Sequence, residues 1–275
     1  MTVIPLTVFL EGQAFLDGVE ITPAEFYLRQ ARGATNATTS QPSPALFAAA
    51  YRQLLKDHDE IVSVHISQRL SGTYAAALQG SEDCAGRVHI VDSELVSMPL
   101  GLLVLAAAEA AKQGDDGAAI ATRLEALRRQ TRVFFMVATL ENLRRGGRIG
   151  AASALLGSVL QMKPVLTIRA GEVTPLERVR TQDRALARLV ELAVAVDTGS
   201  GICAIVGHAA AEPAALEVAD QLSGCAESLL VQPLGPVVGA HAGPGTVGIG
   251  CYPAELIPLG LRELSSSGAS SPRWG

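Results

Sequence analysis

Several features that mark specialised classes of protein are scarce in this sequence. Its four cysteines, Cys84, Cys203, Cys225 and Cys251, show no C-x-x-C spacing, so they imply neither a zinc site nor a disulfide framework. The longest mainly apolar stretch, 98–111, is too short to cross a membrane, and the first residues lack the features of a signal peptide. A formal net charge of −5 gives no electrostatic reason to expect nucleic acid or an anionic membrane surface as a partner. We therefore expect a cytoplasmic protein with no nucleic-acid binding and no stable membrane insertion.

Alternating strand and helix patterns dominate what is present. The chain has 275 residues, of which 48% are hydrophobic and 4% aromatic, a composition typical of a well-cored α/β protein. Residues 61–66 form a nearly continuous β-branched run, typical of a strand buried on both faces of a parallel sheet. Hydrophobic periodicity predicts strands at residues 4–10, 61–66, 88–91, 133–138, 163–168, 172–179, 202–206, 228–232 and 237–252. It predicts helices at residues 22–30, 94–112, 117–130, 140–145, 151–160, 181–196 and 213–222, and two more that start after Ser43 and at Thr73.

The pattern changes near residue 131. Two extended runs, 163–168 and 172–179, flank Ala170-Gly171, which predicts a hairpin and antiparallel pairing in the second half. The last residues are rich in Ser and Gly, a composition typical of a disordered tail. We therefore predict an N-terminal α/β domain at residues 1–130, a C-terminal α/β domain at residues 131–264 and a disordered tail at residues 265–275.

The loop Thr38–Pro44 gathers hydroxyl groups in front of an apolar helix. Ser43 and Pro44 read as the N-cap and first residue of that helix, which is the structural alternative for the whole loop. The cap needs Ser43 alone, so the hydroxyl groups of Thr38, Thr39 and Ser40 are not needed for it. Such a loop could direct hydrogen-bond donors at an anion without supplying a positive charge.

A second polar loop, residues 68–74, joins a predicted buried strand to a short helix. Ser71 lies in this loop, and Gly72 beside it gives close access to the backbone. Parallel sheets bind ligands at the carboxyl ends of their strands, which is where this loop lies. An ordinary strand–loop–helix turn remains the structural alternative.

Two glycine-containing clusters lie in the second half. Arg144–Ile149 places Gly146 and Gly147 among three arginines, which could hold a phosphate or form a helix C-cap with solvated side chains. His241–Thr246 places a histidine on a Gly-Pro-Gly turn, with a structural histidine as the alternative. Neither spacing is that of a P-loop or a dinucleotide fingerprint.

The remaining polar residues suggest no hydrolase. Asp92 and Ser93 close a predicted strand and could equally cap the following helix. No carboxylate pair, metal-ligand cluster or Ser/His/Asp order stands out, so we assign no catalytic residue and no metal site.

Taken together, these clusters resemble the DegV family. The matching segments occur in the order of the family over nearly the whole chain: 39–44, 70–74, 91–93, 140–143 with 145–149, 163–164, 178–181 and 241–246. The family consists of bacterial fatty-acid-binding proteins. Some of its members act as the acyl-carrying subunit of a two-component fatty acid kinase, in which a separate ATP-binding subunit phosphorylates the bound acid.

The resemblance implies a fold and a site. The expected fold has an N-terminal Rossmann-like parallel sheet and a C-terminal α/β domain with a mixed or antiparallel sheet, and the acyl chain of a fatty acid such as palmitate lies between them. Thr39 and Ser71 would meet the carboxylate. The residues expected near the head group or the partner are Ser40, Gly72, Ser93, Arg180 and His241. The protein would need no cofactor and would not be an enzyme on its own.

Two departures from the family pattern stand out. The family usually opens with a strand ending in Asp-Ser, upstream of the segment that matches Ile4-Pro5-Leu6. We therefore expect either that the start site is placed too far downstream or that the first sheet of this chain lacks that strand. The family also commonly has Thr where this chain has Ala242, whose methyl group cannot donate a hydrogen bond.

The chemistry is consistent with this interpretation. Burying on the order of 15 methylenes at roughly 0.8 kcal/mol each would contribute about 12 kcal/mol before association costs, so the tail would dominate affinity. Hydroxyl donors would orient the carboxylate and leave it nucleophilic. Two alternatives are a stand-alone phosphotransferase that uses the loops at Gly146 and Gly243, and a ligand-free signalling or scaffold module.

Overall fold

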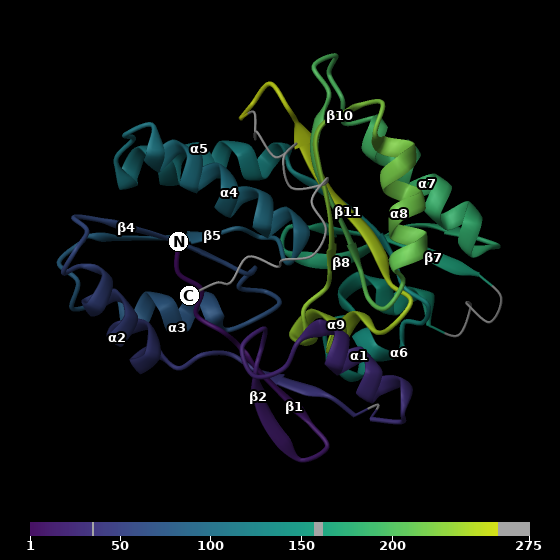
Figure 1. Ribbon diagram of the computed structural model, residues 1–275, viewed down its shortest axis with the longest axis horizontal. Coiled ribbons are helices and arrows are strands. Elements are labelled where there is room, and N and C mark those ends of the chain that lie inside the picture. The colour runs from purple at the N-terminus through teal and green to yellow at the C-terminus, as the bar shows by residue number, and fades with distance from the viewer. Residues whose placement is uncertain (35, 157–161, 258–275) are drawn as a thin grey trace.

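The chain folds into an α/β structure with three sheets, and the computed structural model describes residues 1–34, 36–156 and 162–257. Figure 1 shows one lobe built on a two-stranded parallel sheet, a second lobe built on a six-stranded sheet, and a small antiparallel sheet beneath them. The predicted tail, 265–275, and part of the predicted helix 151–160 lie outside the described residues.

The first lobe confirms the predicted parallel sheet with helices on both faces. Its two described strands, β4 and β5, run parallel with Ile61 beside Val88, and one pair of helices lies above them and another below (Figure 1). The elements are α2 (Pro44–Leu54), β4 (Ile61–His65), α3 (Thr73–Gly80), β5 (Val88–Asp92), α4 (Met98–Lys112) and α5 (Gly117–Gln130).

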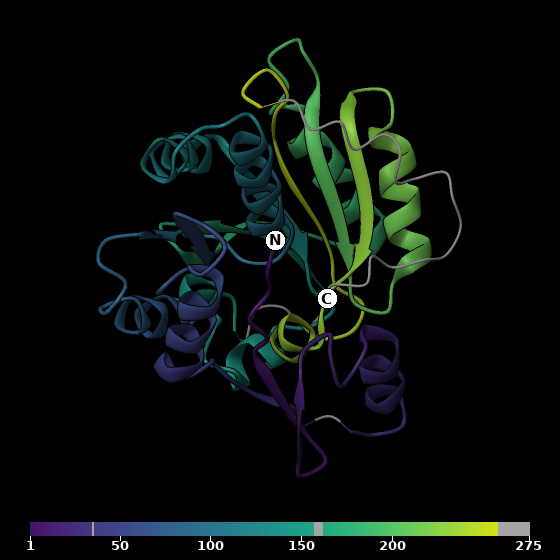
Figure 2. The ribbon, with the colours of Figure 1, turned by 60° about the vertical axis from the view of Figure 1, so that its left-hand side comes forward.

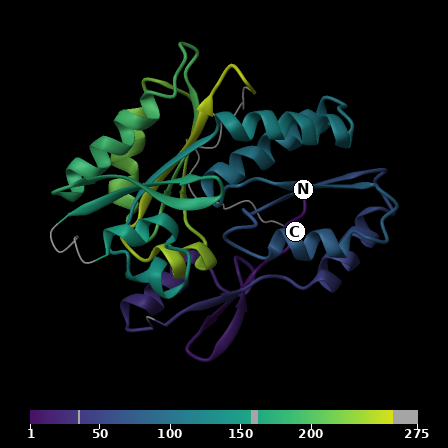
Figure 3. The same ribbon diagram turned by 180° about the vertical axis from the view of Figure 1, so that it is seen from behind.

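The small sheet corrects the prediction for the first residues. The strand expected at 4–10 is β1 (Thr7–Leu10), and it pairs antiparallel with β2 (Gln13–Leu16) and β3 (Thr38–Ser40) instead of joining the parallel sheet. Figure 3 shows the β1–β2 hairpin hanging below both lobes. Val8 and Leu10 lie on the same face of β1 and are buried in the core, so this face anchors the hairpin.

The second lobe is the predicted mixed sheet, in the order β10-β9-β11-β6-β7-β8. β10 and β9 run parallel, every other neighbouring pair is antiparallel, and β7–β8 is the predicted hairpin. The elements are β6 (Arg132–Met136), α6 (Glu141–Arg145), the 3-10 helix η1 (Gly150–Leu155), β7 (Lys163–Arg169), β8 (Glu172–Val179), α7 (Gln182–Val194), β9 (Ile202–His208), α8 (Glu212–Leu222), β10 (Ala226–Pro233) and β11 (Val247–Pro253).

The helix α4 packs against both lobes. It contacts β4 of the first lobe and also β9 and β11 of the second, opposite the face that α7 and α8 cover (Figure 2). Gly250 of β11 lets it approach closely, because a Cβ there would lie 2.6 Å from the Pro99 nitrogen. One hydrophobic cluster therefore runs across residue 130, from Leu102 and Leu103 to Cys203 and Tyr252. The domain boundary stays a prediction.

The predicted helix caps at Thr22 and Ser43 are confirmed, whereas the strand predicted at 237–252 is wrong in its first part. Thr22 accepts a hydrogen bond from Glu25 N and opens α1 (Pro23–Ala31), and Ser43 accepts from Leu46 N to open α2. The strand expected at 237–252 is instead the helix α9 (Pro236–Ala242) followed by β11. Pro236 at its first position favours the helix, which ends at a left-handed Gly243 (φ 80°). None of the described helices is long and apolar enough to cross a membrane.

A buried carboxylate at the start of α9 predicts a pH-dependent stability. Asp17 Oδ2 accepts from Val237 N at 3.3 Å, and burial raises the pKa of Asp17 from 3.8 to about 6. The folded state therefore binds this proton more tightly, and the resulting stabilisation is complete below pH 4 and lost as pH rises through 6. We expect Asp17→Asn to exceed the wild type in unfolding free energy at pH 7, by up to about 3 kcal/mol, and to match it near pH 4.

Urea unfolding from pH 4 to 7 measures this difference. Asp220→Asn is the matched control, because Asp220 is exposed and should show no such trend. An Asp17→Asn advantage that is constant across the pH range would contradict the expectation.

Candidate functional site

A cavity of about 330 Å³ lies where the lobes and the small sheet meet. Its walls are mainly apolar and come from both halves of the sequence, at Leu6, Ile66, Leu70, Val96, Met98, Val133, Phe135, Leu143, Ile168, Val173, Leu234, Val237, Val238 and Ala242. Such a volume and lining are those of a small-molecule site that takes an apolar ligand.

Polar residues complete the lining of the cavity. They are Thr39, Ser40, Gln41, Ser71, Ser97, Arg148, His241 and Thr246. The Gln41 amide occupies the space beside Gly72, so the first polar loop touches the second, next to Ser71. The structure therefore brings Thr39 and Ser71 to one cavity, as the carboxylate assignment requires.

Thr39 is held by His241. Thr39 Oγ1 on β3 lies 2.8 Å from His241 Nε2 on α9, which joins residues 202 positions apart. Burial, with a smaller effect of the Arg148 guanidinium, lowers the pKa of His241 to about 4, so the imidazole is neutral at pH 7. Its Nδ1 is buried and has no hydrogen-bond partner in the described part of the chain.

Ser71 lies at the carboxyl end of β4, where the sequence predicted a ligand-binding loop. Its Oγ is 2.8 Å from Thr73 Oγ1 and accepts a hydrogen bond from Thr73 N at 3.3 Å. The loop is thus ordered by the helix that follows it. The serine hydroxyl stays at the cavity wall.

Arg148 is a lining residue that the sequence reasoning did not select. Its Nε donates to Leu70 O at 2.9 Å and its Nη1 donates to Gly146 O at 2.6 Å, so it links the loop of Ser71 to the end of α6. Both acceptors are neutral carbonyls, which leaves the positive charge without a carboxylate in these contacts. The Arg-Gly-Gly-Arg segment was the signal that could have found it.

The glycine beside this arginine makes room for the histidine. A Cβ at Gly146 would overlap His241 Nδ1, although the backbone there (φ −76°) would accept any residue. The two glycine-containing clusters of the second half, at the ends of α6 and α9, are therefore packed together, with Asn142 against Gly243. The space beside Gly146 is therefore filled by the side chain of His241 and not by a phosphate.

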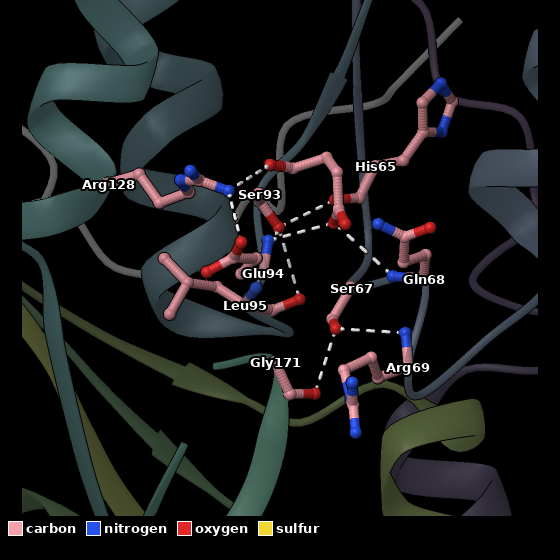
Figure 4. Close-up of polar contacts among 10 residues, drawn as sticks. His65, Ser67, Gln68, Arg69, Ser93, Glu94, Leu95, Arg128 and Gly171 are labelled. Atoms are coloured by element: carbon pink, nitrogen blue, oxygen red, sulfur yellow. Dashed lines mark hydrogen bonds and ion pairs between the residues drawn. The ribbon is translucent and has the colours of Figure 1, made fainter. Parts of the chain in front are cut away.

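Other predicted site residues lie away from the lining. Ser93 is fully buried, and its hydroxyl donates to His65 O and accepts from Leu95 N, so it orders the end of β5 (Figure 4). Arg180 is exposed just past β8 and does not line the cavity. Gly72 contributes close packing through Gln41. Ser93 and Arg180 are thus not among the lining residues, and their role near the head group or in partner engagement stays a prediction.

Comparisons with known proteins agree with the resemblance. Residues 1–254 match the family model described as "Uncharacterised protein, DegV family". A DegV domain-containing protein of Streptomyces coelicolor is 42% identical over 255 residues, 90% of each chain, and one of Deinococcus radiodurans is 41% identical over 256 residues, 92% of this chain and 91% of the relative.

Solved structures agree as well. A structure described as fatty acid binding of a DegV family protein from Thermus thermophilus has a TM-score of 0.87 and 41% identity over 91% of each chain. DegV of Bacillus subtilis, described as a fatty acid binding protein, has a TM-score of 0.82 and 31% identity over 90% of each chain.

The close fit of Gly146 and His241 gives a test of the site. We expect Gly146→Ala to displace the imidazole from its buried position, so that the pKa of His241 rises from about 4 towards 6.5. The measurement is an NMR titration of the His241 ring. Gly224→Ala is the control, because Gly224 has an ordinary backbone conformation and open space beside it. An unchanged titration in Gly146→Ala would contradict the packing argument.

Proposed function

Because this chain belongs to the DegV family, we propose that it binds a long-chain fatty acid in the cavity and presents the carboxylate to a separate ATP-dependent kinase subunit. The observation that carries the proposal is the combination of apolar walls with the hydroxyls of Thr39 and Ser71 at one cavity. The related proteins of Thermus thermophilus and Bacillus subtilis are described as fatty acid binding, which supports the ligand class.

The apolar walls suit the tail. Each buried methylene contributes about 0.8 kcal/mol, so a tail on the order of 15 methylenes would supply most of the affinity after the costs of association. The head group then sets orientation. The tail favours acids with long chains over short ones, whatever their head-group contacts.

The polar residues suit an ionised carboxylate that has to react. If His241 donates through Nε2, Thr39 accepts that bond and its own hydrogen is directed to the carboxylate, while Ser71 supplies a second hydroxyl. Hydroxyl donors leave more negative charge on the carboxylate oxygens than a bidentate arginine would. The neutral state of His241 at pH 7 fits this role.

The proposed partner step is a phosphoryl transfer. A carboxylate oxygen attacks the γ-phosphorus of ATP held by the kinase subunit, the bond to the bridging oxygen breaks, and ADP leaves as the acyl phosphate forms. Arg148, exposed and bonded to neutral carbonyls, could steady the incoming negative charge.

The carboxylate assignment gives a binding prediction. We expect protein purified from bacteria to carry a fatty acid, seen by native mass spectrometry. Replacing both Thr39 and Ser71 with Ala should weaken binding of a long-chain acid by about tenfold to a hundredfold while leaving the fold intact, because each hydroxyl contributes roughly 1 kcal/mol or somewhat more.

The matched control is Ser81→Ala combined with Thr122→Ala. Thr122 is an exposed residue of α5 and Ser81 is the half-buried C-cap residue of α3; both hydroxyls donate to backbone carbonyls, and neither residue lines the cavity. Equal affinity in the Thr39/Ser71 double variant and in this control would remove the head-group assignment.

The kinase step is tested separately. With a bacterial ATP-binding fatty acid kinase subunit, ATP and magnesium, the fatty-acid-loaded protein should yield an acyl phosphate, trapped by hydroxylamine as the hydroxamate. Neither protein alone should do so. Formation of the product by this chain alone would favour the stand-alone phosphotransferase.

A further inference from the structure

The tip of the β7–β8 hairpin touches the loop that carries Ser71. Ser67 Oγ donates to Gly171 O at 2.9 Å, a hydrogen bond between residues 104 positions apart that joins the two lobes. Figure 4 shows the Gly171 carbonyl pointing at the Ser67 hydroxyl, with Arg69 beside it. Ser67 is fully buried, so this bond is shielded from water.

Ser67 also organises its own loop, residues 67–71, which we call the Ser67 turn. Its carbonyl accepts from Leu70 N at 2.9 Å and from Ser71 N at 3.0 Å, and its Oγ accepts from Arg69 N at 3.2 Å. Its own N–H donates to Leu95 O at 2.9 Å. Since the amide of Ser71 is fixed to Ser67, a shift of Ser67 moves Ser71.

The contact requires glycine at the hairpin tip. Gly171 has a φ of 80°, and a Cβ there would overlap Ser67 Oγ and lie 3.4 Å from Arg69 Cδ. The neighbouring Arg69–Glu172 ion pair is about half exposed, at 58% and 41%, so it adds little. The buried Ser67–Gly171 bond therefore carries the contact.

The same hairpin also lines the cavity. Ile168 on β7 and Val173 on β8 are wall residues on either side of the tip, and Ser71 lies on the opposite segment of the lining. We propose that Ser67 is a positioning residue, through which the carbonyl of Gly171 holds Ser71 in the orientation that meets the carboxylate. The ligand part of this inference rests on the proposed function.

The first experiment compares Gly171→Ala with Gly12→Ala in the full chain. Gly12 has nearly the same backbone conformation (φ 78°) at the tip of the β1–β2 hairpin, but nothing lies near its added Cβ, so it reports the backbone cost without the contact. We expect Gly171→Ala to speed amide hydrogen exchange at residues 69–71 and to weaken binding of palmitate about tenfold. Gly12→Ala should leave both unchanged.

The second experiment separates positioning from a general structural role. Ser67→Ala should weaken palmitate binding about as much as Ser71→Ala, roughly tenfold, and should add nothing further in a Ser71→Ala background. Ser228→Ala, another buried serine that does not line the cavity, controls for the loss of a buried hydroxyl. The double variant gives the coupling directly.

The outcomes distinguish this inference from the proposed function. Losses from Ser67→Ala and Ser71→Ala that add in full, or identical exchange in Gly171→Ala and Gly12→Ala, would overturn the positioning role while the wild type still binds palmitate. A wild type that binds no fatty acid would overturn the proposed function, and the exchange comparison then decides alone whether Gly171 holds the Ser67 turn.

Discussion

The hydrogen bond between Thr39 Oγ1 and His241 Nε2 ties the small sheet to the helix α9 at the wall of the cavity. The imidazole that makes it is neutral at pH 7, because burial lowers the pKa of His241 to about 4. Burial in turn depends on the close approach of α6, where the absent side chain of Gly146 leaves space for the ring. The glycine pair among the arginines, the histidine turn and the hydroxyl loop are therefore parts of one packed arrangement.

The described lining of the cavity carries little charge. Arg148 is the one side chain of the described lining that carries a permanent charge, and its guanidinium is directed at the carbonyls of Leu70 and Gly146. Burying a charge without partners is costly, and Arg148 is exposed, so the apolar walls hold no unpaired buried charge in the described lining. An acid bound as we propose would thus meet neutral hydroxyl groups and this one cation.

Much of this arrangement could be predicted from sequence because its signals are local. The caps at Thr22 and Ser43 depend on a hydroxyl and a neighbouring proline, and both form as expected. The strands β2 and β3 were missed because they have 4 and 3 residues and are defined by pairing with β1. The helix α9 was missed because its short sequence, with two valines and one glycine, gives no helical pattern.

The site shows the same division between local and distant information. Ser93 lies in a matching motif, but its hydroxyl is bonded to backbone groups, the carbonyl of His65 on the neighbouring strand and the amide of Leu95 in its own loop, and sequence spacing does not reveal the first of these. Arg148 acts through a carbonyl 78 positions earlier, so its place depends on how the lobes pack. Thr39, Ser71 and His241 came from the resemblance, and the structure brings all three to one cavity.

The helix α4 connects these observations to how such a protein can change over time. Its residues pack on β4 in the first lobe and on β9 and β11 in the second. A substitution in either lobe that shifts α4 therefore also changes the packing of the other lobe. Recombination that replaced one half with that of a distant homologue would pack α4 against a six-stranded sheet from another protein. The glycines and side chains of that sheet would fit a different helix. The two halves therefore constrain each other's sequences across that shared surface, because a residue on either side has to fit α4.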